Sequence, residues 1–170
     1  MEAAGRSFTC TILRPSTVFG CDMPNRSLFE MITMIAHRVF FFIGRPGASA
    51  NYVHVDNVVW ALMLCAQRPK AAKQVYNLSD YRTVEDFVSA VSRFLGVKAP
   101  RMRLPERPVR IAAKLPGRVH SFPLKESRVD ALTTRVTYPT DRIEGELGYA
   151  HRVSMEDGLH ELVDAWKRSR

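Results

Sequence analysis

Short apolar runs that suit strands alternate with segments of helical periodicity along this chain of 170 residues. The runs rich in β-branched and aromatic residues, which predict strands, are 8–13, 39–43, 51–55 and 75–78. Between them, apolar residues recur every three to four positions over 25–37 and from Asp56 to about residue 65, which predicts helices. Strands that alternate with helices are typical of an α/β fold with at least partly parallel pairing. We therefore predict the α/β class.

The second half of the chain carries helix-capping signals. Thr83, followed three residues later by Asp86, has the form of a capping box and predicts a helix that ends near Gly96. Thr140 is expected to cap a short helix that Gly148 ends, and Ser154 to cap the last helix. The helix that begins at Asp56 has apolar residues on nearly all its faces, so we expect it to be mostly buried.

Composition excludes several classes of protein. Apolar residues make up 46% of the chain and charged residues 25%, which is ordinary for a globular domain and argues against disorder. No stretch approaches the roughly 18 uninterrupted apolar residues of a membrane span, and residues 1–6 lack the apolar core of a signal peptide. Three cysteines without metal-type spacing predict reduced thiols and a cytoplasmic location.

Positive charge is concentrated in one segment. The net charge is +8, and residues 98–128 hold nine basic residues against two acidic ones, which leaves +7 in that segment alone. Such a field favours an anionic partner: phosphates on a small molecule, an acidic membrane surface or nucleic acid. A solvated arginine-rich surface is the simpler interpretation. Nucleic acid is disfavoured because no recognition helix or aromatic platform accompanies the charge.

The common catalytic and metal-binding motifs do not occur in this sequence. It contains no G-x-G-x-x-G, P-loop, H-E-x-x-H, C-x-x-C or G-x-S-x-G pattern. His54 and Asp56 have the spacing of a catalytic pair, but no nucleophile is placed to use them, so we expect His54 to make a structural hydrogen bond. We predict no catalytic residue and no metal ligand within this chain.

Four segments together resemble a known family. They are T-I-L-R-P-S-T-V-F-G at 11–20, N-Y-V-H-V-D-N-V at 51–58, V-Y-N-L-S at 75–79, and E-L-G-Y at 146–149 followed by S-M-E-D-G-L at 154–159 and Trp166. In this order and at these spacings, the chain resembles the C-terminal, substrate-binding half of an extended short-chain dehydrogenase/reductase of the NAD-dependent epimerase/dehydratase type.

The resemblance implies a fold and a set of site residues. It implies the last strands and helices of a Rossmann-like parallel sheet over 1–80 and a small α+β substrate-binding subdomain over 81–170. It places Pro15 and Ser16 beside the nicotinamide of NAD or NADP. Thr17 falls where nucleotide-sugar members often carry a substrate-binding Asn, although it could equally be an ordinary loop hydroxyl.

The reacting groups of that family are not found in this sequence. A glycine-rich dinucleotide loop is absent, and none of the five tyrosines begins a Y-x-x-x-K motif. We therefore expect the chain to be inactive alone and to bind NAD(H) weakly or not at all. Without neighbouring strands, the strand at 8–13 would expose apolar surface, which predicts a homodimer or aggregation.

The resemblance also bears on the substrate. Nucleotide-sugar members often carry a phosphate-binding Arg two positions before the strand-end tyrosine, where this chain has Ala50. Four arginines could substitute: Arg45, Arg101, Arg103 and Arg135. We expect a nucleotide sugar or a related hydroxyl or carbonyl compound, with Asn51 also in contact with it; sterols and flavonoids are the alternative. The rival hypothesis is a non-catalytic binding or assembly module that uses residues 98–128.

Overall fold

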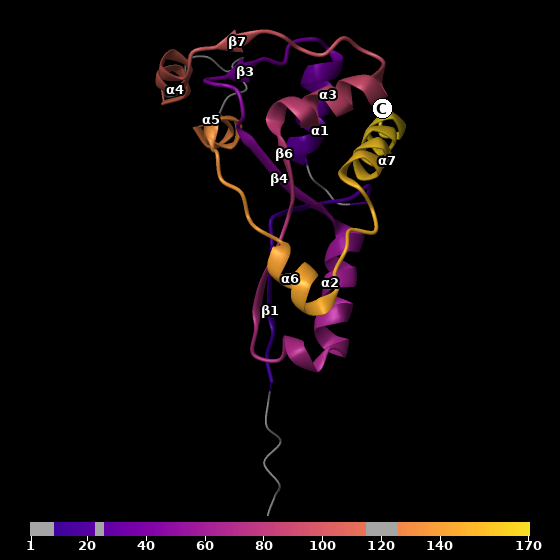
Figure 1. Cartoon of the computed structure of the whole chain (residues 1–170). Coiled ribbons are helices and arrows are strands. Elements are labelled where there is room, and N and C mark those ends of the chain that lie inside the picture. Colours follow the sequence, from indigo (N-terminus) through magenta and orange to yellow (C-terminus); the bar gives the residue numbers. More distant parts are fainter. Residues whose placement is uncertain (1–8, 23–25, 115–125) are drawn as a thin grey trace, which may run out of the picture.

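The computed structural model describes residues 9–22, 26–114 and 126–170 (Figure 1). Within them, three parallel strand pairs form: β1 (Ile12–Pro15) with β5 (Val75–Leu78), β2 (Thr17–Phe19) with β4 (Ser49–His54), and β3 (Phe42–Ile43) with β7 (Arg103–Leu104). β4 also pairs with β6 (Asp80–Thr83) in antiparallel orientation. These parallel pairs confirm the predicted α/β class. Residue 8 of the strand expected at 8–13, residue 25 of the helix expected over 25–37 and part of the basic segment, 115–125, lie outside the described residues.

Helices surround these strands at both ends of an elongated molecule. The helices are α1 (Arg26–Ala36), α2 (Val55–Gln67), α3 (Val84–Leu95), α4 (Glu106–Lys114), α5 (Glu126–Thr133), α6 (Asp141–Leu147) and α7 (Met155–Arg168), with a 3₁₀ turn at Pro69–Ala71. In Figure 1, α2, α6 and β1 lie at the lower end, and β3, β7, α4 and α5 lie at the upper end. None of the helices that the structure describes is long and apolar enough to cross a bilayer.

The larger hydrophobic core joins α1, α3 and α7 beside β4. Leu28, Ile32 and Ile35 of α1 are buried there, as the helical spacing predicted. Trp166 of α7 closes this core, and its Nε1 donates a hydrogen bond to Thr33 Oγ1 at 2.9 Å. Because this core takes residues from both sides of position 80, we keep the division of the chain there as a prediction only.

A second core lies between β5, α2 and α6. Tyr76 and Leu78 of β5 are fully buried against Ile143 of α6. The Tyr76 hydroxyl donates to Glu146 Oε2 at 2.7 Å. Burial, followed by this hydrogen bond, raises the pKa of Tyr76 to about 12, so the hydroxyl stays protonated and keeps α6 attached to β5.

The three predicted capping residues all lie at N-cap positions, and two of them make the side-chain capping bond. The backbone N–H groups of Asp86 and Asp157 each donate at 3.1 Å to the side-chain oxygen of Thr83 and Ser154, respectively. Thr140 occupies the N-cap position of α6 and Gly148 ends that helix, as expected, but the Thr140 hydroxyl makes no capping bond. It instead accepts from Ser79 N at 3.1 Å and donates to Ser79 O at 2.9 Å, because it is buried beside the turn between β5 and β6.

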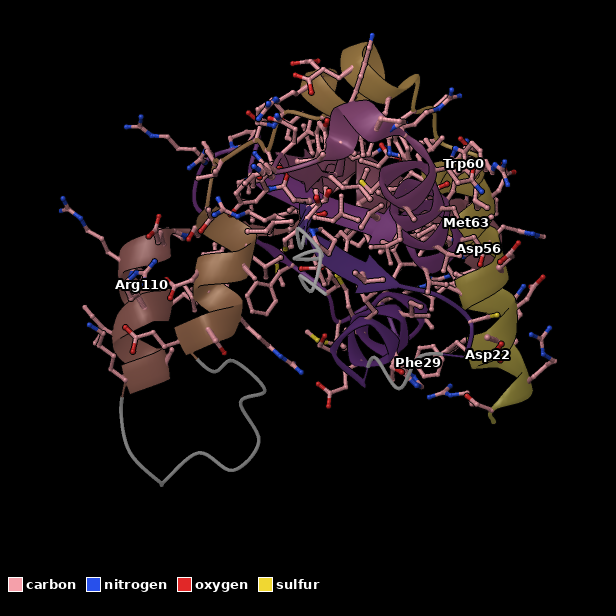
Figure 2. All side chains as sticks on the ribbon, turned by 90° about the horizontal axis from the view of Figure 1, so that it is seen from below. Asp22, Phe29, Asp56, Trp60, Met63 and Arg110 are labelled. Atoms are coloured by element: carbon pink, nitrogen blue, oxygen red, sulfur yellow. The ribbon has the colours of Figure 1, made fainter. Side chains whose placement is uncertain are left out.

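The expectation that α2 is mostly buried was wrong. Val59, Leu62 and Met63 are 49, 52 and 45% exposed (Met63 is labelled in Figure 2). The helix is covered on one side only, where Ala61 and Leu64 are buried and the helix packs on β1, β2, β4 and the 3₁₀ turn. The strand expected over 39–43 is likewise shorter and comprises only Phe42–Ile43.

Gly158 of α7 allows an unusually close helix–strand approach. A Cβ atom at this position would lie 2.9 Å from His54 Cδ2 and 3.0 Å from the Phe19 ring, both in buried side chains. We predict that Gly158→Ala lowers the free energy of unfolding by about 1–3 kcal/mol through overpacking. Gly145→Ala in α6 is the matched control, since nothing lies within 4 Å of its added Cβ. Urea denaturation distinguishes the two variants, and equal stability would contradict the overpacking argument.

The exposed strand β1 generates a second prediction. Ile12 is 47% exposed, and among the described strands β1 pairs only with β5. We expect the chain to self-associate as its concentration rises, and we expect Ile12→Lys to reduce this association because a charged side chain on an edge strand opposes pairing. Sedimentation velocity over a concentration series measures both. A wild-type chain that stays monomeric throughout would refute the expectation.

Candidate functional site

An open cleft forms where the chain passes from one parallel strand pair to the other. β1 ends at Pro15, Ser16 forms the connection, and β2 begins at Thr17. Ser16 N donates to Leu78 O at 2.8 Å, which holds the connection at the carboxyl end of β5. The carboxyl ends of parallel strands at such a switch between partners are the usual ligand site of α/β folds.

The cleft brings together four of the six predicted site residues. Its lining residues are Arg14, Pro15, Ser16, Thr17, Asn51, Tyr52, Asn77, Ala131, Thr134 and Tyr138. Thr17 and Asn51 meet there because β2 pairs with β4, with Thr17 in register with Tyr52. Arg45 and Arg135 lie elsewhere, in a hollow beside β7 and the start of α4.

Arg135 serves the backbone in that second hollow. Its guanidinium donates to the carbonyl oxygens of Arg45 and Pro46, at 2.7 and 3.3 Å, and to Thr133 O at 3.1 Å. Arg103 is also engaged, since it pairs with Glu85 at 2.6 Å. Two of the four arginines considered for phosphate binding are therefore occupied by contacts within the protein.

Two polar atoms in the cleft lack partners. Ser16 Oγ and Asn51 Oδ1 are buried, and neither makes a hydrogen bond to any residue that the structure describes. A buried polar atom without a partner costs roughly 1–3 kcal/mol. A bound ligand with hydrogen-bonding groups would remove that cost, so these two atoms mark where polar parts of a ligand fit.

The far wall of the cleft is an extended segment tied to β4. Ser49 N and Oγ both donate to Thr134 O, at 2.8 and 3.0 Å, and Val136 N donates to Ser49 Oγ at 3.0 Å. Asn51 Nδ2 donates to Val136 O at 2.6 Å. These bonds hold the segment that brings Tyr138 into the wall of the cleft, and the sequence did not single out this tyrosine as a site residue.

An apolar cavity of about 130 Å³ adjoins the cleft. It lies between α1, β4, α3 and α5, and its apolar lining consists of Leu28, Met31, Met34, Phe40, Phe41, Ala50, Tyr52, Val84, Phe87, Ala131 and Leu132. Tyr52 and Ala131 line both the cavity and the cleft. The polar cleft and the apolar cavity are therefore neighbours that share these two wall residues.

Tyr52 forms the partition between these two spaces. Its ring packs on Phe87, with 4.9 Å between the ring centroids. Burial raises the pKa of the Tyr52 hydroxyl, so this side chain is uncharged at neutral pH. The sequence drew attention to this tyrosine only as part of a strand-end motif, because its position between the two spaces depends on α3 and α5.

His54 has the structural role expected for it. Its Nδ1 accepts from Asp56 N at 3.3 Å and so caps α2, and the ring packs edge-on against Phe19 with 5.4 Å between centroids. His54 is absent from the residues that line the cleft. Among the described residues, no cluster of His, Cys, Asp or Glu could hold a metal ion.

Comparison with known proteins identifies the family. The sequence profile described as the 3-beta hydroxysteroid dehydrogenase/isomerase family matches residues 1–106, more than half of the chain. The chain belongs to this family. It is an extended short-chain dehydrogenase/reductase, as the four sequence motifs indicated.

Individual relatives support this membership. The chain is 29% identical, over 97% of its length, to the 4-hydroxy-2-methyl-3-oxo-4-farnesyl-3,4-dihydroquinoline-1-oxide ketoreductase of Stigmatella aurantiaca, and covers 52% of that protein. It is 31% identical, over 95% of its length, to short-chain dehydrogenase/reductase family 42E member 1 of Danio rerio, and covers 45% of it. The chain thus spans about half the length of these relatives.

Solved structures confirm the fold. The UDP-glucuronic acid 4-epimerase of Bacillus cereus in complex with NAD superposes with a TM-score of 0.63 at 17% identity. The match covers 93% of this chain and 44% of the epimerase. The strand pairs described above therefore correspond to part of a Rossmann-type fold.

Proposed function

We propose that this chain forms the substrate side of the active site in an NAD(P)-dependent dehydrogenase or reductase. The reaction interconverts a hydroxyl and a carbonyl group on a largely apolar compound, such as a hydroxysteroid or an isoprenoid-bearing ketone. The observation that carries this proposal is that the polar cleft and the apolar cavity are neighbours, with Tyr52 and Ala131 in the walls of both. The polar reacting end of the substrate would lie in the cleft, and an apolar end would enter the cavity.

The cavity suits a ring or a short alkyl group. Its volume of about 130 Å³ is close to that of cavities, of about 150 Å³, that accept benzene. Burial of such a group contributes roughly 1.5–3 kcal/mol to binding. The single charged residue of the lining, Arg128, forms an ion pair with Glu30, so the cavity does not offer an uncompensated charge.

The known relatives support an apolar substrate. The family is named for hydroxysteroids, and the bacterial relative is named as a ketoreductase of a farnesyl-bearing compound. A nucleotide sugar is the alternative, because one solved structure of similar fold contains UDP-glucuronic acid and NAD. Ala50 lies in the wall of the apolar cavity, where an arginine would fill the space instead of leaving room for a ring.

The cleft fits the nicotinamide end of the cofactor. The partnerless Ser16 Oγ can pair with a carboxamide, which offers both a donor and an acceptor, and Pro15 lies beside it in the lining. When bound, a nicotinamide supplies hydride transfer to or from the carbinol carbon. Ser16 and Asn51 would orient the polar groups, and the apolar wall around Tyr52 would exclude water. The choice between NAD and NADP, and the cytoplasmic location, stay predictions.

A substitution at the mouth of the cavity tests the substrate class. Ala131 is exposed on α5 and lines both spaces, so Ala131→Phe should block entry without disturbing the core. We expect it to weaken binding of a 3β-hydroxysteroid roughly tenfold or more, because the energy of burying one ring is lost. Equilibrium dialysis with the radiolabelled steroid measures this change.

The control for that experiment is Ala112→Phe, which adds the same ring on the exposed side of α4. It should leave steroid binding unchanged. UDP-glucuronic acid is assayed in parallel. Binding of the nucleotide sugar without binding of the steroid would reject the apolar substrate in favour of the alternative.

We further propose that the 170-residue chain alone binds NAD(H) only weakly. A glycine-rich phosphate loop contributes the backbone N–H groups that bind a pyrophosphate, and none occurs in this sequence. Isothermal titration calorimetry with NADH should give a dissociation constant weaker than about 0.1 mM, which corresponds to less than about 5.5 kcal/mol. Sub-micromolar binding would overturn this proposal.

A further inference from the structure

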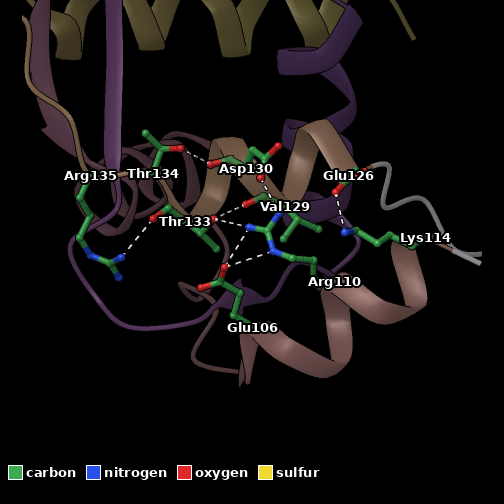
Figure 3. Close-up of polar contacts among 9 residues, drawn as sticks. All are labelled: Glu106, Arg110, Lys114, Glu126, Val129, Asp130, Thr133, Thr134 and Arg135. Carbon is green, nitrogen blue, oxygen red and sulfur yellow. Dashed lines mark hydrogen bonds and ion pairs between the residues drawn. The ribbon is translucent and has the colours of Figure 1, made fainter.

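The basic segment 98–128 separates in the structure into paired and unpaired cations. Arg103 of β7 pairs with Glu85 of α3. Lys114 pairs with Glu126 and Arg110 with Asp130, contacts that join α4 to α5, and Arg110 also pairs with Glu106 of its own helix (Figure 3). Arg128 is paired with Glu30. Among the described residues of the segment, Lys98, Arg101 and Arg107 lack such an ion pair. The charge seen in the sequence therefore leaves a few exposed cations rather than a uniformly basic surface.

Two of these cations share a hollow with a third from another part of the chain. Arg38, in the connection between α1 and β3, lines this hollow together with Lys98 and Arg101. None of the three side chains has an ionic partner in the part of the chain that the structure describes, and no carboxylate lines the hollow. We call this site the basic hollow. Three cationic residues around one hollow, without a carboxylate in its lining, attract an anionic partner.

Two exposed apolar side chains adjoin these cations in the chain. Met102 lines the basic hollow and is 55% exposed, and Val39, which follows Arg38 directly, is also 55% exposed. Large apolar side chains beside lysine and arginine are typical of surfaces that lie in the interface of an anionic membrane. An acidic protein or a nucleic acid would bind to the charges but would gain less binding free energy from contacts with Met102 and Val39.

The position of the hollow fits a membrane as well. The segment that leads from α3 to β7, which carries Lys98, Arg101 and Met102, runs along the outer edge of the molecule at the top of Figure 1. Phe40 lines both the basic hollow and the apolar cavity. A substrate with an apolar skeleton is concentrated in bilayers, so docking at this edge would place the cavity beside its source.

We propose that the basic hollow is a docking surface for an anionic phospholipid membrane. Arg38, Lys98 and Arg101 bind headgroup phosphates, and Met102 and Val39 enter the interfacial region. One support, the adjacent cavity, rests on the proposed function. The test below uses vesicles without any substrate, so its failure would leave the substrate proposal intact.

The main experiment compares two variants with the same change in net charge. Arg38→Gln/Lys98→Gln/Arg101→Gln removes the basic hollow. Arg68→Gln/Lys70→Gln/Lys73→Gln removes three exposed cations at the far end of α2. Each set includes one residue with a positive φ, 59° at Arg38 and 62° at Lys73, so the backbone cost is matched. Circular dichroism verifies that both variants fold.

Co-sedimentation with vesicles of phosphatidylserine and phosphatidylcholine measures binding, with pure phosphatidylcholine as the neutral surface. We expect wild type to bind only the anionic vesicles. Because each cation near the surface contributes about 1 kcal/mol, the hollow variant should bind on the order of a hundredfold more weakly. The control variant should stay close to wild type. Equal losses in the two variants, or no binding by wild type, would overturn the proposal.

A second experiment separates a membrane from another polyanion. Met102→Gln should weaken vesicle binding severalfold but leave binding to soluble heparin unchanged, since only a bilayer offers an apolar phase. Leu62→Gln, which removes an equally exposed apolar side chain from α2, should affect neither. Wild-type vesicle binding that is insensitive to Met102→Gln would reject the membrane in favour of an acidic protein or nucleic acid.

Discussion

The change of strand partner at Ser16 is the constraint on which the rest of the site depends. β1 pairs with β5 and β2 with β4, so two strands that are consecutive in the chain separate at their junction. The bond from Ser16 N to Leu78 O holds that junction at the carboxyl ends of the strands. A continuous strand would satisfy its own backbone groups with one neighbour and would leave no crevice for a ligand.

The elements beyond this junction determine what kind of ligand the cleft suits. Tyr52 is placed by β4 but is enclosed by α3 and α5, and the recess behind it is apolar. The guanidinium of Arg135, which the sequence offered as a phosphate ligand, is directed to backbone carbonyls in a separate hollow. The cleft thus combines a polar floor at Ser16 and Asn51 with an apolar extension, a combination suited to an alcohol or ketone on an apolar skeleton.

Several positive charges of the basic segment 98–128 are neutralised by nearby carboxylates. Arg103, Arg110 and Lys114 come from the basic segment, but each meets a carboxylate supplied by a different helix or by its own helix. Arg38 lies far from that segment in the sequence, yet it joins Lys98 and Arg101 in the basic hollow. The position of a functional cation patch therefore depends on which charges remain unpaired after folding. A count of basic residues along the chain overestimates the amount of unpaired charge.

The sequence by itself determined the elements whose signals are local. The spacing of Leu28, Ile32 and Ile35 predicted the buried face of α1, the caps at Thr83 and Ser154 depend on residues three positions apart, and the motifs around Pro15 and Asn51 placed both in one cleft. Only the tertiary structure decided the roles of Thr140, Tyr138 and Arg135, and the exposed side of α2. Those outcomes depend on contacts between residues tens of positions apart, and periodicity carries no information about such contacts.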